Sequence, residues 1–312
     1  MAGSALAQDV TIKFSHVVAE DTPKGQMALK FKQLVEEKSG GKMLVEVFPN
    51  SQLFTDGKVL KAMLLGDVQL AAPSLSKFSR FTKKLQVYDL PFLFKDMAAV
   101  EKFQQSEKGQ QLLKSMEKKG IVGLGYLHNG MKQLSANSKL AVPADAAGKK
   151  FRIMTSDVLE AQFEAVDAIP LKKPFSEVFT LLQTKAINGQ ENTWSNIYSK
   201  KFFEVQSDIT ETNHGLLDYM VVSSKKFMDS LNDEQQQILK DSLAEALKLG
   251  NDLSAKKAAG DKQKIIDSGV SKVHTITDEQ RQQWVEAMKP VWKKFEGDVG
   301  ADVIEAAVQS NN

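Results

Sequence analysis

The first half of the chain alternates between two periods of hydrophobic and polar positions. Apolar residues at every second position, or in short runs, predict strands at 10–14, 43–48, 68–72 and 121–127. Apolar residues at helical spacing between them predict helices at 23–38, 55–66 and 96–119. Strands that alternate with helices in this order favour a mostly parallel sheet covered by helices.

The pattern restarts near residue 130 and becomes helical in the last third. Further strands are predicted at 131–136, 150–153, 186–189 and 216–222. Shorter helices are predicted at 156–165, 176–184 and 197–203. A long helix should begin at Asn232 and run to about Asp267, and another should follow the capping box of Thr277 and Gln280, with a kink at Pro290. We expect the tryptophans of this last helix to pack in the core.

The fold class that these elements predict is α/β, with two lobes joined by crossing strands and by the long helix. The strand at 216–222 is long enough to pass from one lobe to the other. Lobe I is expected to comprise 8–129 plus 218–257, and lobe II 130–217 plus 258–312. Such an arrangement leaves a cleft between the lobes, which is a favoured place for small ligands and closes by a hinge motion.

Composition narrows the classes of function. The 312 residues carry 41 basic and 39 acidic side chains, a net charge of +2, which argues against a nucleic-acid-binding protein. The absence of cysteine removes disulfides, thiol catalysis and thiolate metal sites. No apolar stretch is long enough to span a bilayer. The Ala5-Leu6-Ala7 box resembles a signal-peptidase site, so 1–7 is interpreted as a signal-peptide remnant and the protein is expected in the periplasm.

An arginine within a short apolar strand is the most informative single position. Arg152 is costly to bury unless an anion meets it, and its guanidinium matches a carboxylate in bidentate fashion. Asn192 and Trp194, which follow the Gly189-Gln190-Glu191 segment, would add an amide and a flat wall. The alternatives are a surface position or an ion pair with Glu191 for Arg152, and core packing for Trp194.

Signs of an enzyme are weak. The four histidines, His16, His128, His214 and His274, are not spaced as metal ligands. Neither a Gly-x-Ser-x-Gly motif nor a phosphate-binding glycine loop occurs. Glu177 and Glu191 could form a carboxylate pair, but Glu177 stands in the first turn of a predicted helix, where the dipole favours it anyway. We therefore expect no catalysis, no cofactor and no metal.

Polar residues also follow the predicted strands of the first lobe. His16, Lys24, Ser74 and Lys77 all lie just beyond strand ends, where ligands bind in doubly wound sheets. Lys24 stands in the first turn of a helix, where the dipole does not favour a cation.

These segments together resemble the solute-binding proteins of tripartite ATP-independent periplasmic (TRAP) transporters, over nearly the whole chain. The resemblance rests on Gly189–Asn192 with Phe175–Val178, Lys200–Gln206 and Thr212–His214, and for the C4-dicarboxylate branch on Phe14–Val18, Thr22–Gly25 and Phe48–Leu53. It implies a periplasmic binding-protein fold of type II-like organisation. One departure is Thr193, where proline is usual.

The resemblance also implies roles for residues. Arg152 would pair with a substrate carboxylate, Asn192 would donate to it, and Phe175 would line the cleft. Glu191 and His214 would form the polar network that orients the arginine. Sialic-acid binders of the family carry an arginine where this chain has Lys132, which disfavours that ligand. The candidates for a second carboxylate are His16, Lys24, Ser74 and Asn129.

The function expected is capture of a small organic acid, foremost succinate, malate or fumarate, and its delivery to the membrane subunits of a TRAP transporter. The chain is expected to act as a monomer. One alternative is a binder of an aromatic or keto monocarboxylate with the same clamp. The other is a periplasmic enzyme on a similar two-lobed scaffold.

Overall fold

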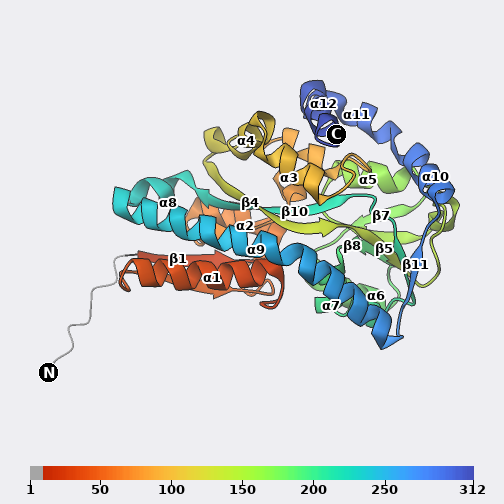
Figure 1. The fold of residues 1–312 in the computed structure, drawn as a ribbon, viewed down its shortest axis with the longest axis horizontal. Coiled ribbons are helices and arrows are strands. Elements are labelled where there is room, and N and C mark those ends of the chain that lie inside the picture. Colours follow the sequence, from red (N-terminus) through yellow and green to blue (C-terminus); the bar gives the residue numbers. More distant parts are fainter. Residues whose placement is uncertain (1–9) are drawn as a thin grey trace.

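Two β-sheets organise the molecule, and the computed structural model describes residues 10–312 (Figure 1). The predicted signal remnant, 1–7, lies outside the described residues. The first sheet has the strand order β2-β1-β3-β10-β4 and the second β11-β9-β5-β8-β6-β7. The strands are β1 Val10–Ser15, β2 Met43–Phe48, β3 Leu70–Ala71, β4 Ile121–Met131, β5 Gln133–Ala136, β6 Lys150–Ile153, β7 Ile169–Lys172, β8 Gly189–Asn192, β9 Asp208–Glu211, β10 Leu216–Ser224 and β11 Lys272–Thr275.

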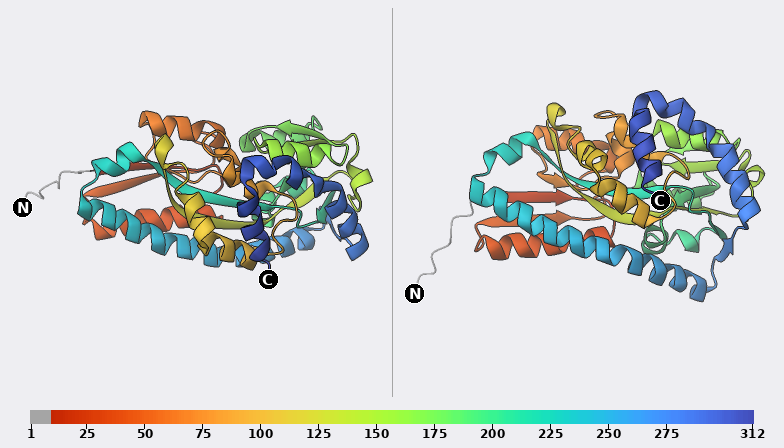
Figure 2. Two further views of the ribbon diagram at one scale, coloured as in Figure 1. Left: turned by 90° about the horizontal axis from the view of Figure 1, so that it is seen from above. Right: turned by 45° about the horizontal axis from the view of Figure 1, so that its top comes forward.

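Helices cover both sheets (Figure 2). They are α1 Pro23–Lys38, α2 Asp56–Leu65, α3 Met97–Gln105, α4 Glu107–Leu113, α5 Asp157–Glu164, α6 Val178–Gln183, α7 Trp194–Ser199, α8 Lys225–Ser230, α9 Asp233–Ser268, α10 Asp278–Met288, α11 Pro290–Val299 and α12 Ala301–Gln309. The 3₁₀ helices are η1 Leu75–Phe78, η2 Lys84–Asp89, η3 Glu117–Lys119, η4 Pro143–Ala146, η5 Phe175–Glu177 and η6 Phe202–Glu204. Over residues 10–312, none of the helices combines the length and apolar character that a membrane crossing requires.

The first sheet follows the predicted alternation of its strands. In β1, Ile12 and Phe14 are buried while Thr11 and Lys13 are exposed, so one face of the strand meets the core. β1 runs parallel to β2 and β3, whereas β10 runs antiparallel to β3 and β4. The expected mostly parallel sheet is therefore a mixed one.

Crossing strands join the two sheets, as predicted. β4 and β10 pair from Leu216 opposite Met131 to Ser224 opposite Ile121. β4 leads directly into β5 of the second sheet, and β9 of the second sheet precedes β10. These segments therefore connect the lobes near the point where a hinge would act.

Helix α9 runs along both halves of the molecule (Figure 1). Asn232 caps its start with a capping box to Gln235, and Gly269 ends it in the left-handed conformation. It contacts α1 beside the first sheet and α7 beside the second. At Gly250 a Cβ atom would lie 2.6 Å from Leu127 Cδ1, so the absence of a side chain lets α9 approach β4 closely. The predicted long helix between lobes is confirmed.

Several predicted elements differ from the structure. The expected helix at 96–119 is divided, because Ser106 adopts an extended conformation and its Oγ accepts from Gly109 N at the start of α4. The strand predicted at 186–189 lies instead at Gly189–Asn192. The helix predicted at 176–184 is the shorter α6 Val178–Gln183, because Ser176 belongs to the preceding η5. Strands β7, β9 and β11 were not predicted.

The C-terminal helices α11 and α12 lie beside elements of both predicted lobes. Helices α11 and α12 contact η2, and α12 also contacts α3, all of which fall within 8–129. Their apolar residues, among them Phe295 and Val303, join one cluster with Phe78 and Phe103. Helix α11 also contacts α5, which falls within 130–217, so the segment 290–309 packs against elements of both predicted lobes. The lobe boundaries stay a prediction.

Candidate functional site

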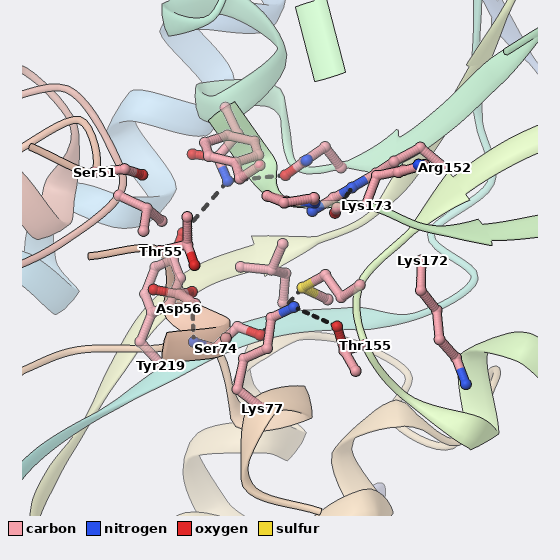
Figure 3. A pocket seen from close by; sticks show the side chains of 18 residues that line it. Ser51, Thr55, Asp56, Ser74, Lys77, Arg152, Thr155, Lys172, Lys173 and Tyr219 are labelled. Carbon is pink, nitrogen blue, oxygen red and sulfur yellow. Dashed lines mark hydrogen bonds between the residues drawn. The ribbon is translucent and has the colours of Figure 1, made fainter. Parts of the chain in front are cut away.

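A cavity lies between the two sheets, bounded on one side by η1 and the start of α2 and on the other by β6 and the end of β8 (Figure 3). It encloses about 640 Å³ of space between atoms, including its opening to solvent. Its lining residues are Val17, Ser51, Thr55, Asp56, Gly57, Ser74, Lys77, Arg152, Met154, Thr155, Lys172, Lys173, Pro174, Phe175, Asn192, Asn196, Leu217 and Tyr219. Of the predicted ligand-binding residues, Arg152, Asn192, Ser74 and Phe175 belong to this lining.

Arg152 is buried in this cavity wall with an exposed fraction of 2%. Its Nε donates to the carbonyl oxygen of Lys173 at 2.9 Å, and its guanidinium carbon lies 5.8 Å from the centre of the Phe175 ring. Among residues 10–312 no carboxylate forms an ion pair with it. Burial lowers the pKa of Arg152 to about 10, against the attraction of Glu191 and Asp56. A desolvated guanidinium with free terminal N–H groups is prepared for an external anion.

Glu191 is the counter-ion of a different cation. Its Oε2 lies 2.8 Å from Lys132 Nζ and 2.8 Å from His214 Nε2, with all three side chains at most 1% exposed. Burial alone would raise the pKa of Glu191, but Lys132 and His214 outweigh it and lower the pKa to about 2. Among residues 10–312 Glu191 pairs with Lys132 and His214 and not with Arg152, so the alternative of an Arg152–Glu191 ion pair does not describe the structure. Lys132 likewise faces Glu191 and is absent from the cavity lining.

Lys77 supplies a second cation to the cavity, and Figure 3 shows Lys77 and Arg152 on opposite sides of it. Its Nζ donates to Thr155 Oγ1 at 3.3 Å. Burial and the nearby Arg152 lower the pKa of Lys77 to about 8, although Asp56 and Asp89 act in the opposite direction. An anion in the cavity would raise this pKa and so favour the charged ammonium form.

Three contacts join η1 and η2 to the segment that follows β6. Besides Lys77 with Thr155, Ser74 Oγ lies 3.1 Å from Met154 Sδ. Ser156 Oγ donates to Asp89 Oδ2 at 2.7 Å. These contacts hold the two sides of the cavity together next to the end of the strand that carries Arg152.

The end of β8 presents amide groups to the cavity. Asn192 Oδ1 accepts from Asn196 Nδ2 at 2.8 Å and from Thr193 N at 3.2 Å. Asn192 Nδ2 is buried and has no hydrogen-bond partner among the described residues. A buried donor without a partner is costly, and a ligand oxygen would satisfy it.

The close packing of β8 positions this end. A Cβ atom at Gly189 would lie 2.3 Å from the carbonyl oxygen of Ser135 and 2.6 Å from Phe151 Cε1. Only glycine therefore fits between β5 and the Phe151 side chain of β6 at the start of the Gly-Gln-Glu-Asn strand.

His16 and Lys24 lie behind the cavity wall rather than in its lining. Both are 1% exposed. Lys24 Nζ donates to the carbonyl oxygen of Ala72 at 2.8 Å and sits 3.4 Å from the centre of the Tyr219 ring, which covers it. Burial and the neighbouring Lys24 lower the pKa of His16 to about 3, so this histidine is neutral. Direct contact with a ligand in the cavity would require these walls to move.

Asn129 and Trp194 are also absent from the lining. Asn129 Nδ2 donates to Thr193 Oγ1 and to the Tyr219 hydroxyl, both at 2.9 Å, so it supports Tyr219, which does line the cavity. Trp194 is 5% exposed and belongs to a core cluster with Ile197 and Ile265. Trp194 therefore packs in the core, as the alternative interpretation of the sequence stated, and does not form a wall of the cavity.

Residues that were not predicted complete the lining. Lys77 was noted at a strand end but was not assigned a contact with the ligand, whereas Tyr219 and Asn196 gave no local signal. Asp56 contributes a carboxylate whose Oδ2 accepts from Ser74 N at 3.3 Å. Lys172 belongs to the lining but does not direct its charge into the cavity. Its Nζ pairs with Asp157 and Glu160 and points away from the cavity (Figure 3). Within residues 10–312, no cluster of His, Asp and Glu has the arrangement of a metal site.

Two lobes around a cavity that is lined by the cations of Arg152 and Lys77 define the class of a solute-binding protein. The model of bacterial extracellular solute-binding protein family 7, DctP, matches residues 14–298. This chain belongs to that family, the DctP family of TRAP solute-binding proteins. The members are binding components of transport systems, not enzymes.

Curated relatives match over almost the whole chain. The C4-dicarboxylate-binding periplasmic protein DctP of Shewanella loihica is 68% identical over 305 residues, which cover 98% of this chain and 91% of that protein. DctP of Vibrio cholerae is 55% identical over 304 residues, with coverages of 97% and 91%.

Solved structures share the fold. A TRAP periplasmic solute-binding protein from Shewanella oneidensis, solved with bound succinate, superposes with a TM-score of 0.96 at 66% identity, covering 97% of this chain and 99% of that one. One from Pseudomonas aeruginosa PAO1, solved with bound L-malate, gives a TM-score of 0.89 at 44% identity, with coverages of 91% and 99%. The two-lobed fold predicted from the sequence is confirmed.

Proposed function

We propose that this protein captures a C4-dicarboxylate such as succinate, malate or fumarate in the periplasm and delivers it to the membrane subunits of a TRAP transporter. The observation that carries the proposal is Arg152, a buried guanidinium that lacks a carboxylate partner among residues 10–312. The ligand carboxylate supplies the missing anion through bidentate hydrogen bonds. Asn192 Nδ2, also buried and without a partner, donates to the same carboxylate.

The second carboxylate is met by Lys77 on the other side of the cavity. A monocarboxylate satisfies one of the two cations and leaves the other desolvated and unpaired, which disfavours it. Ser74, the N-cap of η1, and Thr155, which accepts from Lys77, line the same region. Two cations on opposite walls therefore favour a short dianion over an acid with one charged end.

Ligand binding stabilises the closed arrangement of the lobes. Arg152 lies on β6 of the second sheet, whereas Lys77 lies on η1 beside the first sheet. A dianion between them contacts both lobes only when these approach, so it binds the closed state better than the open state. The relatives solved with succinate and L-malate support this class of ligand. We propose that the protein acts as a monomer.

The test is a calorimetric titration of the ligand-free protein with succinate, L-malate, fumarate, butyrate, benzoate, pyruvate and sialic acid. The three dicarboxylates should bind with one site per chain, and butyrate should bind at least about tenfold more weakly than succinate because one charge-assisted contact is lost. Tighter binding of an aromatic or keto monocarboxylate than of any dicarboxylate would overturn the proposal.

A further inference from the structure

Tyr219 is a buried phenol in the cavity lining that the sequence did not point to. It lies on β10 with an exposed fraction of 3%. Its hydroxyl oxygen accepts a hydrogen bond from Asn129 Nδ2 at 2.9 Å and another from Asn196 Nδ2 at 3.3 Å. Asn129 lies on β4 of the first sheet and Asn196 on α7 beside the second sheet, so elements of both halves of the molecule hold the hydroxyl.

The hydroxyl proton of Tyr219 has no acceptor within residues 10–312. Its oxygen is already occupied by two donors, so the O–H bond is directed away from both amides. Burial raises the pKa of Tyr219, which keeps the phenol protonated and therefore a donor. Leaving such a donor unpaired in a buried position is costly, and the cavity is the place where an acceptor can enter.

The surroundings of the ring favour donation to an anion. The ammonium of Lys24 lies 3.4 Å from the ring centre and draws electron density from the phenol. Lys24 is itself buried, donates to the carbonyl oxygen of Ala72, and forms no ion pair among the described residues. The nearby Asp56 of α2 offsets part of this charge. A carboxylate oxygen beside the hydroxyl would gain from both the hydrogen bond and the field of Lys24.

We propose that the Tyr219 hydroxyl donates a hydrogen bond to a carboxylate oxygen of the bound ligand, with Asn129 and Asn196 holding the phenol in the donating orientation. The inference rests on the proposed function, because it needs an anionic ligand in this cavity. Under this proposal Asn129 does not contact the ligand but orients the Tyr219 hydroxyl, which does.

The direct test is the affinity of Tyr219→Phe for succinate, measured by isothermal titration calorimetry. Loss of a hydrogen bond to a charged acceptor should weaken binding by about 10-fold or more. The variant should fold, because Asn129 Nδ2 keeps Thr193 Oγ1 and Asn196 Nδ2 keeps Asn192 Oδ1 as acceptors. Its melting temperature without ligand provides that check.

Tyr126→Phe is the matched control. Tyr126 lies on the neighbouring strand opposite Met220, and its hydroxyl donates to the carbonyl oxygen of Gly109 at 2.7 Å, outside the cavity lining. It should bind succinate as the unsubstituted protein does.

A second change at position 219 preserves the shape of the side chain. 3-Fluorotyrosine is a more acidic phenol than tyrosine, so the protein that carries it at position 219 should bind succinate more tightly.

The outcomes separate the two proposals. Failure of the unsubstituted protein to bind any dicarboxylate overturns the proposed function. Binding by the unsubstituted protein, with the same affinity in Tyr219→Phe and no change with 3-fluorotyrosine, overturns only the inference about Tyr219. Weaker binding in Tyr219→Phe with unchanged binding in Tyr126→Phe supports it.

Discussion

Lys132 Nζ and Glu191 Oε2 lie 2.8 Å apart, with each side chain 1% exposed. This pair explains why Arg152, one strand away from Glu191, remains without a counter-ion. The carboxylate that could have neutralised Arg152 is already held by a lysine and by His214. The buried charges on β6, β8 and their described neighbours are thus divided into the ion-pair network of Lys132, Glu191 and His214 and the unpaired Arg152, which faces the cavity.

Glu191→Gln should destabilise the ligand-free protein strongly. The substitution leaves the ammonium of Lys132 buried without an anion, and breaking a buried pair typically costs about 3–5 kcal/mol of the free energy of unfolding. Chemical denaturation measures this change. Glu204→Gln is the control, because Glu204 pairs with Lys201 at 3.3 Å on the surface and should change the stability by less than about 1 kcal/mol. Equal effects of the two substitutions would contradict the account.

Gly189→Ala should also destabilise the protein, by about 1–3 kcal/mol. The added methyl group meets the backbone oxygen of Ser135 at 2.3 Å, and a backbone atom inside a sheet cannot move aside cheaply. Gly260→Ala provides the matched control in α9, where no atom lies within 4 Å of the new Cβ. It should stabilise the protein by up to about 1 kcal/mol through helix propensity. Thermal unfolding of both variants checks the pair, and a neutral Gly189→Ala would refute the packing argument.

The sequence was informative about Arg152 because a charged residue in a short apolar strand breaks the local pattern. It was also informative about helix ends, since Thr22 before Pro23 and the capping boxes act locally. Strands β7, β9 and β11 have four residues each and little apolar alternation, so their place in the second sheet depends on partners distant in sequence.

The first-lobe side of the site was harder to predict for a physical reason. Lys24 follows a strand end, as expected of a ligand-binding residue, but the ring of Tyr219 covers its ammonium. Tyr219 reaches that position because β10 runs antiparallel to β3, with Val222 opposite Ala71, a pairing between segments about 150 residues apart. Such a pairing leaves no trace in the local pattern. Lys77 was noticed at a strand end, but the sequence offered no means of preferring it to Lys24.

Affinity for succinate should fall as the pH rises above about 8. The pKa of Lys77 in the ligand-free protein is about 8, and a bound carboxylate raises it. Above pH 8 the lysine is neutral in the free protein and must take up a proton on binding, which weakens affinity by up to about tenfold per pH unit. Below pH 8 it is already charged, so this contribution is complete.

Lys77→Met should bind succinate about tenfold or more weakly at pH 7 and should show a shallower fall above pH 8. Lys84→Met, at an exposed position of η2, is the control and should keep both the affinity and the pH profile. Calorimetric titrations between pH 6 and 10 provide the measurement. An unchanged profile in Lys77→Met would show that another group carries the pH dependence.

The central claim is that Arg152 is a buried cation completed by the ligand's carboxylate, and calorimetric titration of Arg152→Met with succinate tests it most directly. We expect affinity at least about 100-fold lower than in the unsubstituted protein, and a ligand-free melting temperature that is not lower, because an unpaired buried charge has been removed. Arg80→Met, at an exposed position, should bind normally. Succinate binding by Arg152→Met with the affinity of the unsubstituted protein would contradict the account.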